Sequence, residues 1–279
     1  MILYWVCLPL AWLLWHLLWR IEVTGREYLI GDKAGRGYVV ASNHISDIDP
    51  VFICVSIFSW RRVGIIAKEE LFRNPLIGWC LGRLGAVPIA RGKGDVRTLG
   101  KMTALVEKGH GMLVFPEGTR TKDGRIGKIK SGAFVVASAA AADMIPCRII
   151  YDTPDGRMHL FCKVRVCFGP HIPAADLHIE DPRHSVAQIR VLKNRLNACW
   201  DALYTANRFP DSPTLEEIDA RAAAKAAAKA AAKTANAAEA KPAEQPKPAQ
   251  PDHAEHTASI SLPKMELPGV GSADPEGGI

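Results

Sequence analysis

The sequence predicts an α/β domain with a mostly parallel sheet flanked by helices, an N-terminal membrane-anchoring helix and a disordered C-terminal tail. Three observations indicate this. An apolar run opens the chain, short β-branched runs alternate with helical patterns through its middle, and its end is rich in Ala, Lys and Pro. We therefore expect the anchor over residues 1–20, the α/β domain over 21–210 and the low-complexity tail over 211–279.

The first segment is apolar from Ile2 to Trp19, apart from His16. As a helix it would be about 27 Å long, just short of the hydrocarbon core of a membrane. Pro9 would kink it, and its aromatic side chains are spread along its length, which is typical of an interfacial segment. A spanning helix and a half-buried helix both fit this pattern. Because Arg20 and a basic domain follow directly, we expect the domain on the cytoplasmic face of the cell (inner) membrane.

Seven short runs in the middle of the chain are rich in β-branched residues and predict strands. They are Ile21 to Thr24, Tyr38 to Ser42, Val63 to Lys68, Ala86 to Ala90, Met112 to Phe115, Pro146 to Tyr151 and His159 to Phe168. Asp155-Gly156 falls between the last two runs and is a hairpin signal. We therefore expect the sheet to end with an antiparallel edge.

Helical patterns separate most of these runs, and this alternation favours parallel pairing of the strands. The helical stretches are Val51 to Phe58, Pro75 to Leu84, Asp95 to Lys108, Gly132 to Ala142 and Ser185 to Tyr204. The last stretch has apolar residues at helical spacing and is expected to close the domain.

Charge is distributed unevenly along the chain. Residues 1–210 carry a net charge of +10 and residues 211–279 one of −4, which together give the +6 of the whole chain. A basic folded part favours an anionic membrane surface or a phosphate-bearing substrate. The Ala-Ala-Ala-Lys repeats over Ala222 to Lys233 predict a solvated helix, and because the tail as a whole is acidic we expect no nucleic-acid partner. The seven cysteines are scattered among apolar neighbours, so we expect neither disulfides nor a structural metal.

A polar cluster, Asn43-His44-Ile45-Ser46-Asp47-Ile48-Asp49-Pro50, follows the predicted strand that ends at Ser42. α/β folds place their sites at such strand ends. A neutral imidazole can remove a proton from an alcohol, and a carboxylate on its other nitrogen would fix the tautomer and stabilise the imidazolium. His44 is therefore the candidate base and Asp49 the candidate orienting acid, with Asp47 as the alternative partner.

A second cluster, Phe115-Pro116-Glu117-Gly118-Thr119-Arg120, follows an apolar run and precedes a basic loop. Gly118 allows the backbone to approach a ligand, and Arg120 offers a bidentate fork to phosphate. Glu117 can hold that arginine or bind a ligand hydroxyl. Strand, sharp turn and basic loop together indicate a phosphate or anion site.

A third cluster, Gly85-Ala86-Val87-Pro88-Ile89-Ala90-Arg91-Gly92, is a predicted strand that ends in an arginine, and Lys68 ends another strand. Parallel strands carry their carboxyl ends to one edge of a sheet. We therefore expect Lys68 and Arg91 to converge with His44 and with the turn from Glu117 to Arg120.

Taken in their order along the chain, these three clusters resemble sequence blocks of the glycerolipid acyltransferase family, specifically its lysophosphatidic acid acyltransferase branch. The resemblance covers residues 20–170. It rests on Asn43-His44-x4-Asp49, Gly85-x-Val87-x-Ile89-x-Arg91, Phe115-Pro116-Glu117-Gly118-Thr119-Arg120 and the apolar stretch that ends in Ile145-Pro146. The sequence departs from the family pattern at Pro88, where the family usually carries a bulky apolar residue, and at Asp47, which is an extra acid in the first block.

The resemblance implies transfer of a fatty acyl group from acyl-CoA or acyl carrier protein to the sn-2 hydroxyl of 1-acylglycerol-3-phosphate (lysophosphatidic acid), giving phosphatidic acid in phospholipid biosynthesis. It implies that His44, oriented by Asp49, is the general base and that the hydroxyl attacks the thioester directly. The residues that would bind the phosphate and glycerol of the acceptor are Lys68, Arg91, Glu117, Gly118, Thr119 and Arg120. The block near Pro146 would contribute to the acyl or donor pocket. We expect membrane lipids as partners, and no metal or cofactor besides the acyl donor.

Two other functions stay open, namely acyl transfer to a different lysolipid and non-catalytic binding of membrane phospholipids. A metal-dependent phosphoesterase would need further His or carboxylate ligands near the strand ends, and none is evident. A serine hydrolase is disfavoured because the sequence has no Gly-x-Ser-x-Gly elbow.

Overall fold

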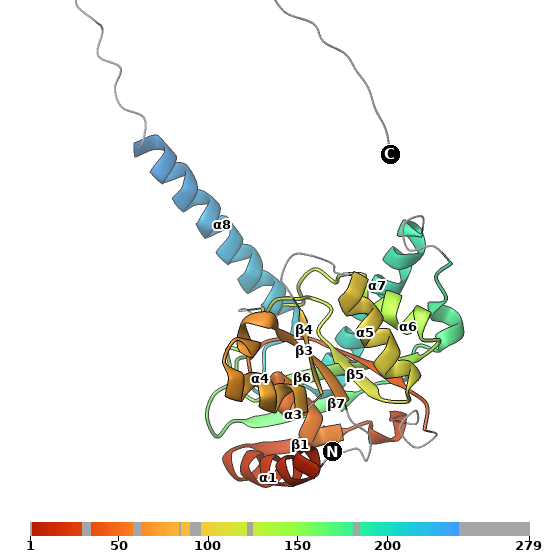
Figure 1. Cartoon of the computed structure of the whole chain (residues 1–279). Coiled ribbons are helices and arrows are strands. Elements are labelled where there is room, and N and C mark those ends of the chain that lie inside the picture. The colour runs from red at the N-terminus through yellow and green to blue at the C-terminus, as the bar shows by residue number, and fades with distance from the viewer. Residues whose placement is uncertain are drawn as a thin grey trace, which may run out of the picture. The chain divides into compact units, whose positions relative to one another are not determined.

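The structure is a computed structural model that describes residues 2–29, 35–57, 63–83, 85–89, 96–121, 125–180 and 185–239. Residues 1–232 form one compact unit, and residues 233–279 form the other. Arg91 lies outside the described residues, and of Lys68 only the backbone is described. The order of the elements along the chain can be followed by colour in Figure 1.

Seven strands form one sheet in the order β1-β7-β6-β2-β5-β3-β4. Their bounds are β1 Arg20–Thr24, β2 Tyr38–Ser42, β3 Val63–Lys68, β4 Ala86–Ile89, β5 Gly111–Val114, β6 Asp143–Tyr151 and β7 Lys163–Phe168. Every neighbouring pair is parallel except β6 and β7. The prediction of a mostly parallel sheet is therefore confirmed.

The prediction that an antiparallel pair forms the edge of the sheet is wrong. The antiparallel pair of β6 and β7 exists, but β1 pairs with the outer side of β7 and forms the edge of the sheet itself. The connection between β6 and β7 is also longer than a tight hairpin, because β7 begins only at Lys163. The apolar start of the expected strand at His159 belongs to this loop.

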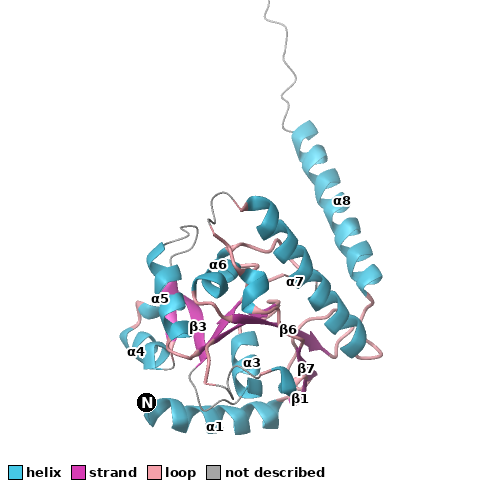
Figure 2. Ribbon diagram, turned by 90° about the vertical axis from the view of Figure 1, so that its right-hand side faces the viewer, coloured by secondary structure: helices cyan, strands magenta, loops and turns pink. Residues whose placement is uncertain are grey.

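The centre of the sheet is buried on both faces, as parallel strands flanked by helices require. All five residues of β2 are buried, and alternate side chains point to opposite faces. Val39 and Ala41 join a core with α5, α6 and α7, whereas Tyr38 and Val40 join a core with α1 and α3. Figure 2 shows α1 and α3 on one side of the strands and α6 and α7 on the other.

A helix is found in each of the five predicted stretches, and two more lie near the ends of the described chain. The helices are α1 Ile2–Leu18, α3 Asp49–Ile57, α4 Pro75–Arg83, α5 Val96–Glu107, α6 Gly132–Ala139, α7 Val186–Asn207 and α8 Leu215–Glu239. Three short 3-10 helices complete the described elements, at Arg26–Tyr28, Glu69–Phe72 and Ala174–Leu177.

Helix α1 packs on the domain with one side only. Ala11 and Trp15 contact the core formed with α3, and the Trp19 ring just after the helix donates a hydrogen bond to the carbonyl of His159 at 2.9 Å. The opposite side exposes large apolar side chains at helical spacing, namely Val6, Leu10, Leu13, Leu14 and Leu17. Among the described residues, no helix has the length and apolar character needed to cross a membrane.

Helix α7 closes the other face of the sheet. Its apolar residues Ile189, Leu192 and Leu196 are buried, and the Trp200 ring donates a hydrogen bond to the carbonyl of Ala41 in β2 at 3.0 Å. Helix α8 lies in the region expected to form the tail, where Ile218 in its first turns packs among buried apolar side chains. Residues 240–279 lie outside the described part of the chain.

Candidate active site

The site lies where four neighbouring parallel strands end. Strands β2, β5, β3 and β4 are consecutive in the sheet, so their carboxyl ends share one edge. His44 follows β2, the turn that begins at Pro116 follows β5, and Lys68 is the last residue of β3. The sheet order thus brings together the backbone positions that the sequence expects to converge, apart from Arg91, whose structure is not described.

His44 and Asp49 form the central polar pair. The Nδ1 atom of His44 lies 2.9 Å from Oδ2 of Asp49. The Asp49 side chain is completely buried, whereas 18% of the His44 side chain is exposed. Because a carboxylate is an acceptor, Nδ1 carries the proton, and Nε2 of a neutral ring is left as the proton acceptor. Among the described residues, nothing hydrogen-bonds to this Nε2.

Asp49 is held by more donors than the imidazole alone. Its Oδ2 accepts the backbone N–H groups of Ile45 at 2.6 Å and Ser46 at 2.8 Å, and its Oδ1 accepts the phenol of Tyr151. Asp49 also begins α3, where a helix favours negative charge. Burial and the Asp49 charge raise the pKa of Tyr151 well above its ordinary value, so the phenol stays a donor. These contacts hold the buried Asp49 carboxylate in place against Nδ1 of the His44 ring.

Asp47 does not compete for the histidine in this structure. Its side chain is 70% exposed and forms an ion pair with Arg120, whose side chain is 43% exposed. The alternative that the sequence left open, a His44–Asp47 pair, is therefore not the one that the structure shows.

The plane of the imidazole is fixed by a ring from the neighbouring loop. Phe115, the first residue after β5, stacks on His44 with ring centroids 4.1 Å apart and an angle of 26° between the planes. Rotation of the His44 ring about χ2, or movement of the ring away from Asp49, would break this stacking contact.

Glu117 points into the protein and joins two loops. It is 3% exposed, its Oε1 accepts the backbone N–H of His44 at 2.9 Å, and its Oε2 accepts that of Gly127 at 2.5 Å. Burial raises the pKa of Glu117, while these two N–H groups and the charge of Arg148 act in the opposite direction. The expected hold of Glu117 on Arg120 is not present, because both carboxylate oxygens bond to backbone groups instead.

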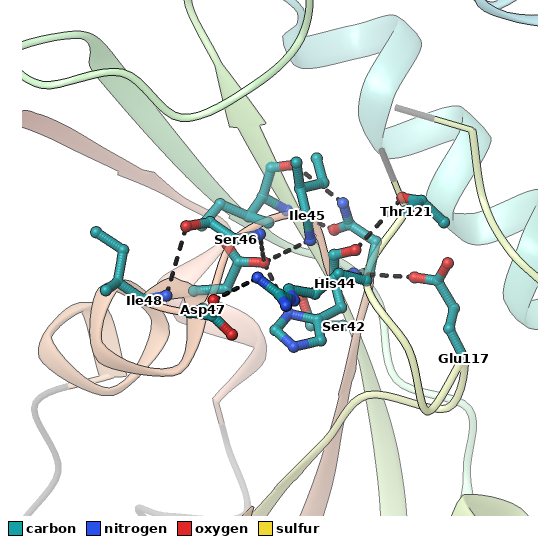
Figure 3. A network of polar contacts seen from close by, with 12 residues as sticks. Ser42, His44, Ile45, Ser46, Asp47, Ile48, Glu117 and Thr121 are labelled. Carbon is teal, nitrogen blue, oxygen red and sulfur yellow. Dashed lines mark hydrogen bonds and ion pairs between the residues drawn. The ribbon is translucent and has the colours of Figure 1, made fainter. Parts of the chain in front are cut away.

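A second set of bonds ties the same loops together. The backbone N–H and the hydroxyl of Thr121 both donate to the carbonyl of His44, at 2.9 and 3.3 Å. Figure 3 shows Glu117 and Thr121 approaching the His44 backbone while the imidazole points away from them. On the other side of this loop, the amide of Asn43 bonds to both backbone groups of Ile149 in β6, at 2.8 and 3.3 Å. The loop that carries the base is therefore anchored on both sides.

The turn after β5 presents its polar groups outward. Gly118, Thr119 and Arg120 are all exposed, and the N–H of Gly118 closes the turn on the carbonyl of Phe115 at 2.9 Å. The φ of Gly118 is 68°, in the left-handed region that favours glycine. The turn therefore places these groups at the protein surface, where Arg120 pairs with Asp47.

Arg148 is a residue of this region that the sequence analysis missed. It lies in β6, is 1% exposed, and its Nε and Nη1 have no hydrogen-bond partner in the described part of the chain. Its guanidinium lies 5.0 Å from the ring centre of Tyr204. Burial lowers the pKa of Arg148, and the charges of Asp201 and Glu117 oppose that shift. The sequence feature that could have identified Arg148 is a charged residue within an otherwise apolar strand pattern.

Comparison with known proteins gives one family match. Residues 20–150 match the family model described as Acyltransferase. This range includes β1 to β5, most of β6, and the His44 and Glu117 loops.

Named relatives agree with that match. The chloroplastic 1-acyl-sn-glycerol-3-phosphate acyltransferase LPAT1 of Arabidopsis thaliana is 35% identical over 130 residues, which are 46% of this chain and 35% of that protein. The 1-acyl-sn-glycerol-3-phosphate acyltransferase of Bacillus subtilis is 27% identical over 179 residues, which are 63% of this chain and 86% of that protein. The chain thus spans about a third of the length of the plant relatives, at 35% and 36%.

A solved structure is also similar. It is the crystal structure of the 1-acyl-sn-glycerophosphate (LPA) acyltransferase PlsC from Thermotoga maritima, with a TM-score of 0.48 and 22% sequence identity. The match covers 64% of this chain and 71% of that one.

Proposed function

Since residues 20–150 of this chain belong to the acyltransferase family, we propose that the protein transfers a fatty acyl group from a thioester to the sn-2 hydroxyl of 1-acylglycerol-3-phosphate. The observation that carries this proposal is the His44–Asp49 pair, with Nδ1 of the ring bonded to a buried carboxylate and Nε2 left to accept a proton. The names of the relatives support 1-acylglycerol-3-phosphate as the acceptor.

The proposed reaction is one acyl transfer with a single base. Nε2 of His44 takes the proton of the acceptor hydroxyl as its oxygen attacks the thioester carbonyl. The tetrahedral intermediate collapses, the C–S bond breaks, and the thiolate leaves with the proton that the imidazolium returns. The products are phosphatidic acid and a free thiol. Asp49 stabilises the imidazolium during this step and keeps its own negative charge.

The acceptor phosphate would be bound by the basic groups at the same edge of the sheet. Arg120 is exposed, and among the described residues it pairs with the exposed Asp47, an ion pair of the kind that contributes little stability. A phosphate carrying more charge than a carboxylate can therefore displace Asp47 and take the bidentate fork. Gly118 and Thr119 would contact the glycerol from the same turn, and Lys68 and Arg91 would add positive charge. For Glu117, the buried position supports a role in holding the His44 loop.

The donor would be acyl-CoA or acyl carrier protein, with no other cofactor. Both present the acyl group as a thioester, and the proposed step needs nothing further, because the base that removes the proton also returns it. Phospholipid biosynthesis is the process that a phosphatidic acid product would serve.

We propose that the protein acts at a membrane surface, with α1 lying in the interface. The apolar residues Val6, Leu10, Leu13, Leu14 and Leu17 share one exposed side of the helix. Contiguous apolar surface of this kind is typical of protein or membrane contact. The basic folded part would favour an anionic leaflet, such as the cytoplasmic face of the cell membrane.

A direct test is to incubate the purified protein with a panel of lysolipids and labelled acyl-CoA, and to identify the products by mass. We expect labelled phosphatidic acid from 1-acylglycerol-3-phosphate, undiminished by excess chelator. If product forms only from a different lysolipid, that lysolipid is the acceptor and the assignment of 1-acylglycerol-3-phosphate is wrong. If the protein binds lipid but transfers no acyl group from acyl-CoA or acyl carrier protein, it is a lipid-binding protein and not an acyltransferase.

A further inference from the structure

A groove of about 560 Å³ adjoins the loop that begins at Gly127, on the side of the sheet covered by α7, and takes no part in the chemistry proposed above. One wall is the loop from Gly127 to Ser131, and the other is the first half of α7. Its volume is within the range of small-molecule sites in proteins. Its polar lining residues include Lys128, Ser131, Arg190, Lys193, Asn194 and Asn197.

The charged side chains that line this groove in the described part of the chain are all positive. Lys128, Arg190 and Lys193 line it, and none of these cations has an ion pair within 4 Å among the residues that the structure describes. Arg195 offers a contrast on the same helix, since it pairs with Asp176 and does not line the groove. Cations gathered without carboxylates around a concave surface favour a ligand with several negative charges.

The groove adjoins the catalytic loop through Gly127. The N–H of this glycine donates to Oε2 of Glu117 at 2.5 Å, and Oε1 of the same carboxylate accepts the N–H of His44 at 2.9 Å. Glu117 thus connects the wall of the groove to the backbone of the loop that carries the base, whereas the imidazole itself points away from Glu117. The phosphate end of a pantetheine thioester is separated from its sulfur by the pantetheine arm, so it need not touch His44.

We propose that this groove binds the nucleotide end of acyl-CoA. The pyrophosphate and the 3′-phosphate of CoA supply several negative charges for the three cations, and Asn194 adds an exposed amide that suits an adenine edge. The arm of acyl carrier protein carries a lone phosphodiester and has less charge to offer this groove. The inference rests on the proposed function only in taking the donor to be a thioester.

The test measures equilibrium binding of CoA and of 3′-phospho-ADP to the full chain by calorimetry, without any turnover. The variant is Arg190→Gln with Lys193→Gln. The control is Arg195→Gln with Lys225→Gln, which removes the same charge from exposed positions outside the groove. We expect the groove variant to bind both ligands roughly 30-fold more weakly, the product of two contacts of about 1 kcal/mol each. The control is expected to bind as the original protein does.

Steady-state kinetics adds a second readout. In the groove variant, KM for acyl-CoA is expected to rise while KM for the lysophospholipid and kcat stay unchanged. If the double substitution disturbs the fold by circular dichroism, Arg190→Gln alone, at an exposed position, is used with an expected weakening of about fivefold.

The outcomes separate this inference from the proposed function. CoA binding equal in groove and control variants overturns the inference, as does saturable transfer from acyl carrier protein with no binding of CoA. In that second case the acyltransferase function itself survives. If the protein binds CoA through Arg190 and Lys193 but transfers no acyl group, the groove is confirmed as a CoA site and the proposed function is rejected.

Discussion

Oδ2 of Asp49 lies 2.9 Å from Nδ1 of His44, and the same oxygen accepts the backbone N–H groups of Ile45 and Ser46. One buried oxygen thus sets both the shape of the loop and the direction of the ring. Since the carboxylate is completely buried and the ring is partly exposed, the proton acceptor Nε2 is the part of the pair that a substrate can approach.

Replacing Asp49 by Asn should lower kcat by about 10²–10⁴-fold, because the amide no longer stabilises the imidazolium and can favour the wrong tautomer. Asp47→Asn is the matched control, since Asp47 is exposed and bonds to Arg120 instead of the histidine. Steady-state rates with saturating substrates measure both. Equal losses in the two variants would refute the assignment of Asp49 as the orienting acid.

Glu117→Gln should lower the free energy of unfolding by about 1–3 kcal/mol, because the amide NH₂ faces one of the two N–H groups that the carboxylate accepts. Burial raises the folded pKa of Glu117, so its contribution to stability is fullest below the ordinary pKa and falls as pH rises through the folded value. The difference in unfolding free energy between the original protein and the variant should therefore shrink as pH rises above the ordinary pKa of a glutamate side chain. Urea denaturation across this range measures it. A difference that grows with pH would contradict the raised pKa.

Arg148→Met should lower the free energy of unfolding by about 0.5–3 kcal/mol, because it removes a buried cation whose charge acts on Asp201 and Glu117, with neither of which it forms an ion pair among the described residues. Arg195→Met is the control, since it breaks only the exposed pair with Asp176 and should cost about 0–1 kcal/mol. Adding Glu117→Gln to Arg148→Met should recover part of the loss. A simple sum of the two single losses would show that the two charges do not interact.

Leu10→Glu combined with Leu13→Glu should release the protein from vesicles that contain anionic lipid, because both side chains lie on the exposed apolar side of α1. Flotation of the protein with such vesicles measures this. Val191→Glu with Val186→Glu serves as the control at two exposed apolar positions of α7. Undiminished flotation of the α1 variant would exclude this side of α1 as the membrane contact.

Local patterns were sufficient to predict most of the fold. The strands at Tyr38–Ser42 and Val63–Lys68 have the predicted bounds, because each is a short run of mostly apolar residues; the first is buried throughout and the second in part. The position of the antiparallel pair was not predictable in this way. It depends on β1 pairing with β7 across more than 100 residues of chain, and the hairpin signal at Asp155-Gly156 carries no information about that contact.

For the site, spacing identified His44 and Asp49 but not their surroundings. A carboxylate five residues after a histidine can form a pair within one loop, so its geometry is local. Tyr151 and Arg148 reach the site from β6, about 100 residues away, and only the order of the strands places them there. The inward direction of Glu117 likewise depends on N–H groups of two other loops.

The most direct test of the proposed function is the rate of acyl transfer to 1-acylglycerol-3-phosphate by the His44→Ala variant, with folding checked by circular dichroism and thermal unfolding. We expect a folded protein whose rate falls at least about 10²-fold, because no other base has been placed beside the acceptor hydroxyl. A folded variant that transfers acyl groups at the original rate would contradict the role of His44 and with it the proposed mechanism.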